Sequence, residues 1–454
     1  MLFVCFLFIS YCNNQTIIND TTIINSNFKD INVESIIILS SAEKIENFAF
    51  FNCKELKSVV FSNDSRVKII GIFAFAFCVN LESVIISRSV EIIGDGSFNR
   101  CVKLKSVVFS NDSSVFSIGE FAFAYCYNLE SVIFPKYIRD IYEHVFYQCI
   151  KLKSVVFSNE PSLKFIGAYA FAECSSLESI IIPKLVKVID FYGFFECENL
   201  KSVMFSNKSS LSVIGEYAFA KCYNLESLVI PGLLYFIGNH AFCNCTKLNS
   251  AIFLKPPKSH ESIVNYVLSF LSMLPVKLYN KITGNDSNFK LNFEIKEYTF
   301  YGCKNLKTVE FFDDYHFQSI GNNAFEQCSS LESFILQSSI KSIEEKAFFN
   351  CSKLSKFVIS SNSLLNSIGI RTFGYCSKLR LFLIPNDIKS IQSLAFEGCI
   401  GLIRFYYYGV KEPNVAVDSF SGCPNLKEIH VTKLYQNNLF GGIKIKRIPL
   451  LGRE

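Results

Sequence analysis

The chain has 454 residues and a mass of 51.6 kDa; half of its residues are hydrophobic and only 19% are charged, which excludes a disordered chain and predicts a large buried core. The 45 Lys and Arg residues nearly balance the 40 Asp and Glu residues, so charge alone gives no reason to expect nucleic acid or an anionic membrane as a partner. The unusual features are 47 Phe, 18 Cys and no Trp, and the positions of the Phe and Cys residues decide the interpretation.

Residues 1–12 are interpreted as a signal peptide. An unbroken apolar run from Leu2 to Ile9 is followed by polar residues, and this run is too short to span a bilayer. No Lys or Arg precedes it, so an ordinary apolar N-terminus is the alternative. Eight Asn-x-Ser/Thr sequons agree with export, and the candidate glycosylation sites among them are Asn63, Asn111, Asn207 and Asn285. No later segment has 18 consecutive apolar residues and no C-terminal anchor is recognised, so we expect a secreted or cell-surface protein without a transmembrane segment.

A repeat becomes visible in the spacing of fifteen cysteines. They lie at positions 53, 78, 101, 126, 149, 174, 197, 222, 245, 303, 328, 351, 376, 399 and 423. A long spacing, as from Cys53 to Cys78, alternates with a short spacing, as from Cys78 to Cys101, until the much larger interval that ends at Cys303. This interval would keep the phase if it contained one degenerate repeat and an insertion of ten residues. The spacing therefore indicates a continuous array of repeats.

Each repeat combines a strand pattern with a turn pattern. Every one of the fifteen cysteines has Phe three residues before it and Leu three residues after it, and two apolar residues at alternate positions follow the Leu. The alternating stretch predicts a short strand, and the Phe-x-x-Cys spacing predicts a short helical turn with both side chains on one face. The expected core is represented by Phe50, Cys53, Leu56, Phe123, Cys126 and Leu129.

The predicted fold class is an α/β repeat solenoid. We expect a leucine-rich-repeat array with a parallel β-sheet on one face and short helical turns on the other, because a unit of about 24 residues cannot bury enough apolar surface alone and must stack on its neighbours. The expected organisation is an N-terminal cap at 13–32, repeats at 33–253, a degenerate repeat with insertion at 254–299, repeats at 300–431 and a C-terminal cap or tail at 432–454. Residues 259–274 predict an amphipathic helix that ends at Pro275.

The repeated unit, Leu-x-x-φ-x-φ followed by Ile-Gly-x-x-Ala-Phe-x-x-Cys-x-x-Leu with φ apolar, closely resembles the BspA-like class of leucine-rich repeats. This class occurs in surface antigens of oral bacteria and parasitic protists. The resemblance covers about residues 33–431. It implies a surface or secreted adhesin that binds host cells or matrix proteins, and it implies no catalytic residue in the repeats. The strand-ending Pro of the class is present only in some units, at Pro135, Pro183, Pro231 and Pro385.

The residues themselves offer no catalytic or metal site. Each repeat cysteine occupies the same register in its own coil, so neighbouring thiols point the same way, and we expect a column of free buried thiols rather than disulfides. The five His residues are scattered, no Cys/His cluster has zinc spacing, and no nucleophile, phosphate-binding or dinucleotide-binding motif is present. We therefore expect a protein without cofactor or metal that is not an enzyme.

The outer face of the predicted sheet carries the candidate binding surface. One column of this face alternates in charge, which favours the stacking register, and its members are Lys57, Glu82, Lys105, Glu130, Lys153, Glu178, Lys201 and Glu226. A second column is apolar where a solvated face should be polar, and its members are Val60, Ile85, Val108, Ile133, Val156, Ile181, Met204 and Val229, with Ile252, Ile335, Val358 and Leu383 further along the chain. For the charged column the alternative is a solvated ladder that only supports the stacking. For the apolar column the alternative is that β-branched residues merely suit a strand. Towards the C-terminus both columns give way to aromatic and basic residues: Arg404, Tyr406, Tyr408, Lys427 and His430. These residues form either a second contact or an end cap.

Two binding functions remain from these patterns. The first is an exported adhesin-like protein whose sheet face binds a protein ligand of host cells or extracellular matrix. The second is an intracellular leucine-rich-repeat scaffold in which a reducing compartment keeps the thiols free. The sequence leaves the identity of the ligand and the oligomeric state open.

Overall fold

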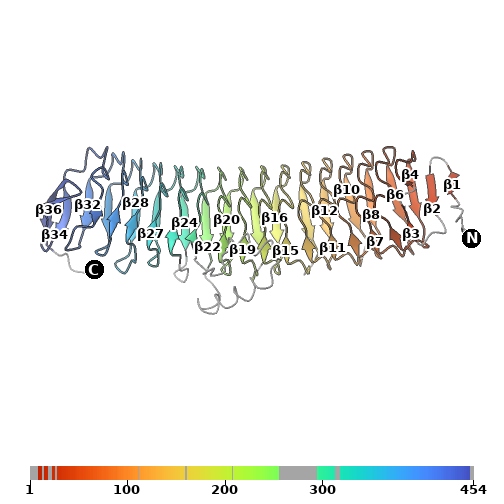
Figure 1. Cartoon of the computed structure of the whole chain (residues 1–454), viewed down its shortest axis with the longest axis horizontal. Coiled ribbons are helices and arrows are strands. Elements are labelled where there is room, and N and C mark those ends of the chain that lie inside the picture. Colours follow the sequence, from red (N-terminus) through yellow and green to blue (C-terminus); the bar gives the residue numbers. More distant parts are fainter. Residues whose placement is uncertain are drawn as a thin grey trace, which may run out of the picture. The chain divides into compact units, whose positions relative to one another are not determined.

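The computed structural model describes residues 9–12, 15–18, 23–25, 28–110, 112–158, 161–206, 208–254, 294–311 and 317–449. The chain divides into two compact units, Met1–Leu225 (unit 1) and Glu226–Glu454 (unit 2). In each unit, successive coils place one long strand beside the long strand of the preceding coil (Figure 1). In unit 1 the long strands form one sheet, whereas in unit 2 they are divided among three sheets. We call the sheets of the long strands together the main sheet, and the shorter strands form a second layer. The parallel solenoid of leucine-rich-repeat type that the sequence predicts is confirmed.

The described residues of unit 1 form ten long strands and nine short strands. In the main sheet the strands are β1 (Ile9–Cys12), β2 (Gln15–Ile18), β4 (Ser35–Ile38), β6 (Ser58–Phe61), β8 (Ser83–Ile86), β10 (Ser106–Phe109), β12 (Ser131–Phe134), β14 (Ser154–Phe157), β16 (Ser179–Ile182) and β18 (Ser202–Phe205). In the second layer they are β3 (Ile23–Ile24), β5 (Lys44–Ile45), β7 (Ile69–Ile70), β9 (Ile92–Ile93), β11 (Ser117–Ile118), β13 (Asp140–Ile141), β15 (Phe165–Ile166), β17 (Val188–Ile189) and β19 (Val213–Ile214). Only β1 is antiparallel to its neighbour, so the parallel ladder of the described residues begins at β2.

Unit 2 repeats this arrangement. Its long strands are β20 (Ser227–Ile230), β22 (Ser250–Phe253), β24 (Thr308–Phe311), β26 (Ser333–Leu336), β28 (Lys356–Ile359), β30 (Leu381–Ile384), β32 (Arg404–Tyr407), β34 (Ile429–Thr432) and β36 (Ile443–Ile448). Its short strands are β21 (Phe236–Ile237), β23 (Glu294–Ile295), β25 (Ser319–Ile320), β27 (Ser342–Ile343), β29 (Ser367–Ile368), β31 (Ser390–Ile391), β33 (Asn414–Val415) and β35 (Leu439–Phe440). Strand β35 is antiparallel to β36, whereas β36 is parallel to β34.

The helical turns expected opposite the sheet are wrong, because the described residues contain no α-helix. Two residues of most coils, such as Phe73 (φ 52°) and Phe77 (φ 62°), have left-handed backbone conformations, which end a helix before it can propagate. Successive N–H groups of the turn therefore donate alternately to a carbonyl of their own coil and to a carbonyl of the next coil. Ala74 donates within the coil to Gly71, whereas Phe75 donates to Ser97 of the next coil. The turns form a hydrogen-bonded ladder of their own, which we call the turn face.

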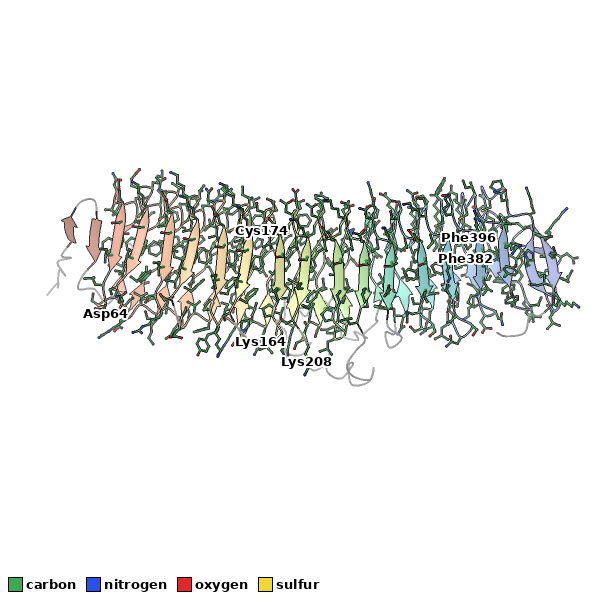
Figure 2. All side chains as sticks on the ribbon, turned by 180° about the vertical axis from the view of Figure 1, so that it is seen from behind. Asp64, Lys164, Cys174, Lys208, Phe382 and Phe396 are labelled. Atoms are coloured by element: carbon green, nitrogen blue, oxygen red, sulfur yellow. The ribbon has the colours of Figure 1, made fainter. Side chains whose placement is uncertain are left out.

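The core of each coil is the Phe and Cys pair that defines the repeat. Phe98 lies parallel to Phe75 and to Phe123, with ring centroids 5.2 Å apart in both cases. Thiols of the column donate to the carbonyl of the Phe in the preceding coil, for example Cys149 Sγ to Phe123 O at 3.3 Å. In unit 2 a second layer of rings joins this column, as Phe382 meets Phe396 edge-on at 5.0 Å (Figure 2). A small side chain that donates to a backbone carbonyl thus explains Cys at this position.

The spacing of the coils controls how closely the long strands pair. Neighbouring strands at the short spacing pair over four residues, as β8 with β10 and β16 with β18 do. At the long spacing, β6 pairs with β8 and β10 with β12 over two residues, and β14 pairs with β16 over one. The two additional residues of the long spacing lie in the loop after the long strand, so the carboxyl ends of the strands separate. We call these three contacts open junctions and the four-residue contacts closed junctions.

The long strands on either side of the long gap between Cys245 and Cys303 are neighbours in the main sheet. Strand β22 pairs directly with β24 over four residues, and Phe300 stacks on Phe242 with ring centroids 5.5 Å apart. The coils of these two cysteines are therefore neighbours. The degenerate repeat expected at 254–299 stays a prediction, because most of its residues lie outside the described ones. Residues 255–293, including the expected helix at 259–274, lie outside the described residues.

Candidate binding face

The apolar column of the sheet face is exposed throughout unit 1. Its exposed fractions range from 48% at Val60 and Met204 to 62% at Ile133, and Ile85, Val108, Val156 and Ile181 lie between these values. The residue before each of them on its strand is buried, as Val132 is before Ile133. The residue after it is buried on four of the seven strands, and Phe109, Phe157 and Phe205 are half-buried. The alternation along each strand therefore turns one apolar side chain per coil to solvent. We call this column in unit 1 the apolar stripe.

In unit 2 the corresponding column is less uniform. Val229 is 43% exposed and Ile335 is 63% exposed, but Ile252 is half-buried. Glu310 of β24 aligns with Ile252, so a carboxylate interrupts the apolar column. The apolar column was predicted to continue towards the C-terminus, but none of its predicted members lies on β24. At this strand the column is interrupted.

The charge ladder forms ion pairs across closed junctions of unit 1. Lys57 Nζ lies 3.0 Å from Glu34, Lys105 Nζ lies 3.0 Å from Glu82, and Lys201 Nζ lies 3.0 Å from Glu178. The Lys105 ammonium lowers the pKa of the Glu82 carboxyl, mainly through their hydrogen bond. Among the described residues no ion pair of the charge ladder spans an open junction, and Glu130, Lys153 and Glu226 form none. The charge alternates continuously along this column in the sequence, but in the structure the column forms separate ion pairs.

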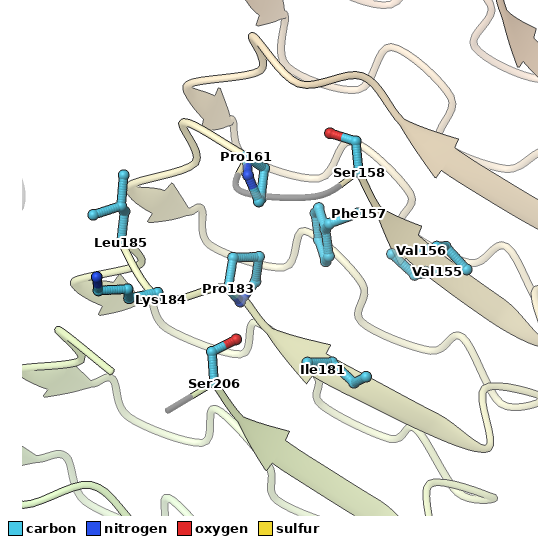
Figure 3. A pocket seen from close by; sticks show the side chains of 10 residues that line it. All are labelled: Val155, Val156, Phe157, Ser158, Pro161, Ile181, Pro183, Lys184, Leu185 and Ser206. Carbon is cyan, nitrogen blue, oxygen red and sulfur yellow. The ribbon is translucent and has the colours of Figure 1, made fainter. Parts of the chain in front are cut away.

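One open junction forms a groove beside the apolar stripe. Between β14 and β16 an open space of about 600 Å³ is lined by stripe residues Val156 and Ile181, by Phe157, and by Pro161, Pro183 and Leu185 (Figure 3). Lys184 and the hydroxyls of Ser158 and Ser206 add polar groups. Pro183 has no N–H to donate to a ladder where the two strands separate. The groove offers an apolar recess with one cation, suited to a bulky side chain of a partner.

The candidate glycosylation sites are only partly within the described residues. Asn63 is exposed, as a glycan would require, whereas Asn111, Asn207 and Asn285 lie outside the described residues. Asn350 and Asn244, which the sequence places beside buried cysteines, are exposed and half-buried respectively. Residues 1–8 of the expected signal peptide lie outside the described residues, and residues 9–12 form β1.

The core residues that the sequence selects have no access to solvent. Phe50, Cys53, Leu56, Phe123, Cys126 and Leu129 are all fully buried. The described cysteines are free thiols. Burial raises the pKa of the Cys126, Cys149 and Cys174 thiols far above the ordinary value, so these groups remain protonated and unreactive at neutral pH. The thiol column belongs to the core rather than to a site.

Sequence reasoning missed an aromatic column on the turn face. Rings of Phe121, His144, Tyr169, Tyr192 and Tyr217 stack in parallel, with centroid distances from 4.3 to 4.7 Å. Burial raises the pKa of Tyr192 to about 12. These residues lie two positions before the core Phe, where the backbone is left-handed, so the run of aromatic residues at that position was the available signal. Rings stacked this closely present edges rather than faces to solvent, which suits stabilisation of the turns.

Two other kinds of feature are absent from the described residues. None of the described segments forms a helix of the length and hydropathy needed to cross a bilayer. Within the same residues, no three His, Cys, Asp or Glu side chains are grouped in a way that could hold a metal ion.

The known proteins that this chain resembles are repeat proteins of the leucine-rich type. The family model of the BspA type leucine rich repeat region matches residues 21–153, 116–249, 164–292 and 280–403. No curated protein matches the chain significantly. A leucine-rich repeat protein from Bacteroides ovatus is 23% identical, with 92% of this chain and 84% of that chain covered and a TM-score of 0.48. A leucine rich cell surface protein from Faecalibacterium prausnitzii is 21% identical, with 88% and 79% covered and a TM-score of 0.31. The pneumococcal vaccine antigen PcpA is 17% identical, with 91% and 74% covered and a TM-score of 0.29. Because the family model spans most of the sequence, this chain belongs to the family of BspA-type leucine-rich repeat proteins.

Proposed function

We propose that this chain is a non-enzymatic, adhesin-like protein of the cell surface or extracellular space, and that the sheet face of unit 1 binds a protein ligand of host cells or extracellular matrix. Seven aliphatic or thioether side chains stand exposed in one column, one per strand from β6 to β18. Soluble proteins rarely leave a continuous apolar surface of this kind uncovered. This exposed column is the observation that carries the proposal.

The surroundings of the stripe support a protein partner. Ion pairs at closed junctions lie beside the stripe, at the start of the same strands. A polar margin around an apolar centre is the usual anatomy of a protein interface. The groove at β14 and β16 adds a recess in which one anchoring side chain of the ligand could be buried.

The test replaces stripe residues with charge. Ile133→Glu and Ile181→Glu place a carboxylate at the centre of the stripe, and we expect each to lower binding to cultured epithelial cells and to a coated matrix extract at least tenfold. Ile150→Glu is the matched control, because Ile150 is 42% exposed but follows Cys149 on the turn face. Circular dichroism checks that all three variants remain folded. Unchanged binding by both stripe variants would remove the stripe from the proposal.

The second candidate is an intracellular interaction scaffold. The free thiols of all described cysteines favour it, because a reducing compartment preserves thiols. Protein purified from its native cells and treated with an endoglycosidase separates the two functions. A mobility shift supports export, whereas protein without glycans and with an intact N-terminus supports the scaffold.

A further inference from the structure

The main sheet changes its chemistry at the last strands of unit 2. Tyr406 of β32 aligns with His430 of β34, and His430 aligns with Lys446 of β36, so these three residues follow one another across the outer face. The rings of Tyr406 and His430 lie 4.8 Å apart. On β36, Lys444 and Lys446 are both exposed and share one face of the strand. Aromatic and basic side chains thus replace the aliphatic column.

The positive charges of this surface are poorly balanced. Glu428 is its one nearby carboxylate among the described residues, and its Oε1 lies 3.1 Å from Lys446 Nζ and 3.7 Å from His430 Nε2. Arg404, Lys427 and Lys444 form no ion pair with any described residue. In unit 1, by contrast, Lys57, Lys105 and Lys201 of the sheet face are neutralised by a Glu of the preceding strand. The surface is therefore complementary to an anionic partner.

The strand that carries these lysines also has an incomplete backbone ladder. On one side β36 pairs with β34 through Ile445–Ile448. On the other side β35 pairs only with Ile443 and Lys444. Within the described residues, no strand covers the outer edge of β36 from Ile445 onward. Such an edge presents N–H and C=O groups to which an extended segment can add.

We infer that the outer edge of β36 accepts an extended acidic peptide segment of a partner protein as an additional strand. The backbone of the peptide would continue the ladder beyond Ile445, and a carboxylate on the outer face would lie about 4.8 Å from Lys446. Lys444 pairs with Leu439 of β35, so it would attract the peptide from the neighbouring end of the edge without lying directly beside it. Lysines on an edge strand ordinarily repel strands of other proteins. An acidic strand converts this repulsion into attraction, so the same lysines select the partner. This surface differs from the apolar stripe and does not depend on it.

The test measures fluorescence anisotropy of a labelled eight-residue peptide with alternating Val and Glu, added to the full chain. We expect Lys444→Glu with Lys446→Glu to weaken binding about tenfold, because the contact at Lys446 and the longer-range attraction by Lys444 both become repulsive. A peptide with Lys in place of Glu should bind this double variant better than the original protein. Lys341→Glu with Lys378→Glu is the matched control, since both lysines are exposed elsewhere in unit 2, and it should bind like the original protein.

Backbone addition is separated from simple attraction of polyanions by N-methylation. Methyl groups on alternate amides of one peptide edge should abolish binding, and the same groups on the opposite edge should leave it unchanged, because only one edge faces β36. If both methylated peptides bind like the parent, or if heparin binds the protein more tightly than any peptide does, the surface is a polyanion site and the inference is wrong. If the double lysine variant binds the acidic peptide normally, the inference is also wrong.

Discussion

The buried thiol column predicts that this protein loses stability at alkaline pH. Six fully buried thiols of unit 1 have a pKa raised chiefly by burial and share no hydrogen bond with another thiol: Cys101, Cys126, Cys149, Cys174, Cys197 and Cys222. In the unfolded chain a cysteine ionises near pH 8.5. Above that pH the unfolded chain has released thiol protons that the folded unit retains, so the free energy of unfolding falls as the pH rises.

The magnitude follows from the number of thiols. Between about pH 7.5 and pH 9.5, ionisation in the unfolded chain favours unfolding by about 1.4 kcal/mol per thiol when the folded thiol stays protonated. Six thiols together give a loss of about 8 kcal/mol, which is comparable to the whole stability of a typical domain. We therefore expect unit 1 to approach unfolding near the upper end of this range.

The assay is urea denaturation followed by far-ultraviolet circular dichroism at several pH values, with a phosphine reductant present throughout. Cys149→Ala should reduce the pH-dependent loss by about 1.4 kcal/mol, and a variant with Cys126, Cys149 and Cys174 all replaced by Ala should lose about half of it. These variants will be less stable at every pH, so the comparison uses the pH dependence and not the absolute stability. A free energy of unfolding that stays constant over this range would refute the reasoning.

Three further predictions concern the rings and a histidine. Phe146→Ala should lower the free energy of unfolding by about 3–5 kcal/mol in urea denaturation, because this buried ring stacks on its two column neighbours with centroid distances of 5.5 and 5.3 Å. Phe146→Leu should lower it clearly less, and equal losses would contradict a role for stacking. Tyr192→Ala interrupts the aromatic column of the turn face and should cost about 1–3 kcal/mol, measured as a lower Tm, whereas Tyr192→Phe should cost little. Burial, assisted by the charges of Lys446 and Arg404 and opposed by Glu428, lowers the pKa of His430, so stability of unit 2 should fall as the pH drops below about 6.5, and His430→Phe should flatten that acid limb in circular dichroism.

The period of the sequence was sufficient to predict the solenoid. Phe50, Cys53 and Leu56 recur with fixed spacing, and a fixed spacing can bury the same three side chains in every coil only if the coils stack. The alternation of Val132, Ile133 and Phe134 likewise predicted which side chain is exposed. These features depend on short-range geometry, which the sequence pattern records directly.

The features that could not be predicted depend on contacts between coils. Phe73 and Phe77 give no sign in their residue type of a left-handed backbone, which is stabilised by hydrogen bonds to the next coil. Whether Glu130 and Lys153 pair depends on side-chain placement that the alternation of charge does not specify. The neighbouring coils of Cys245 and Cys303 could not be recognised either, because an insertion and a degenerate repeat have the same length in sequence.

The alternation of short and long spacings gives the structural period of the main sheet as two coils, which leads to a final prediction. Deleting residues 107–154 of unit 1 removes two coils and joins Ser106 to Val155, so closed and open junctions still alternate. Deleting residues 107–131 removes one coil, and the resulting strand has the short spacing on both sides, which places Lys105 between Glu82 and Lys153. The urea midpoint should therefore fall more after the shorter deletion, although fewer residues and fewer buried rings are lost. If the midpoint instead follows the number of deleted residues, the coils are equivalent, and the open junctions have no structural role in the array.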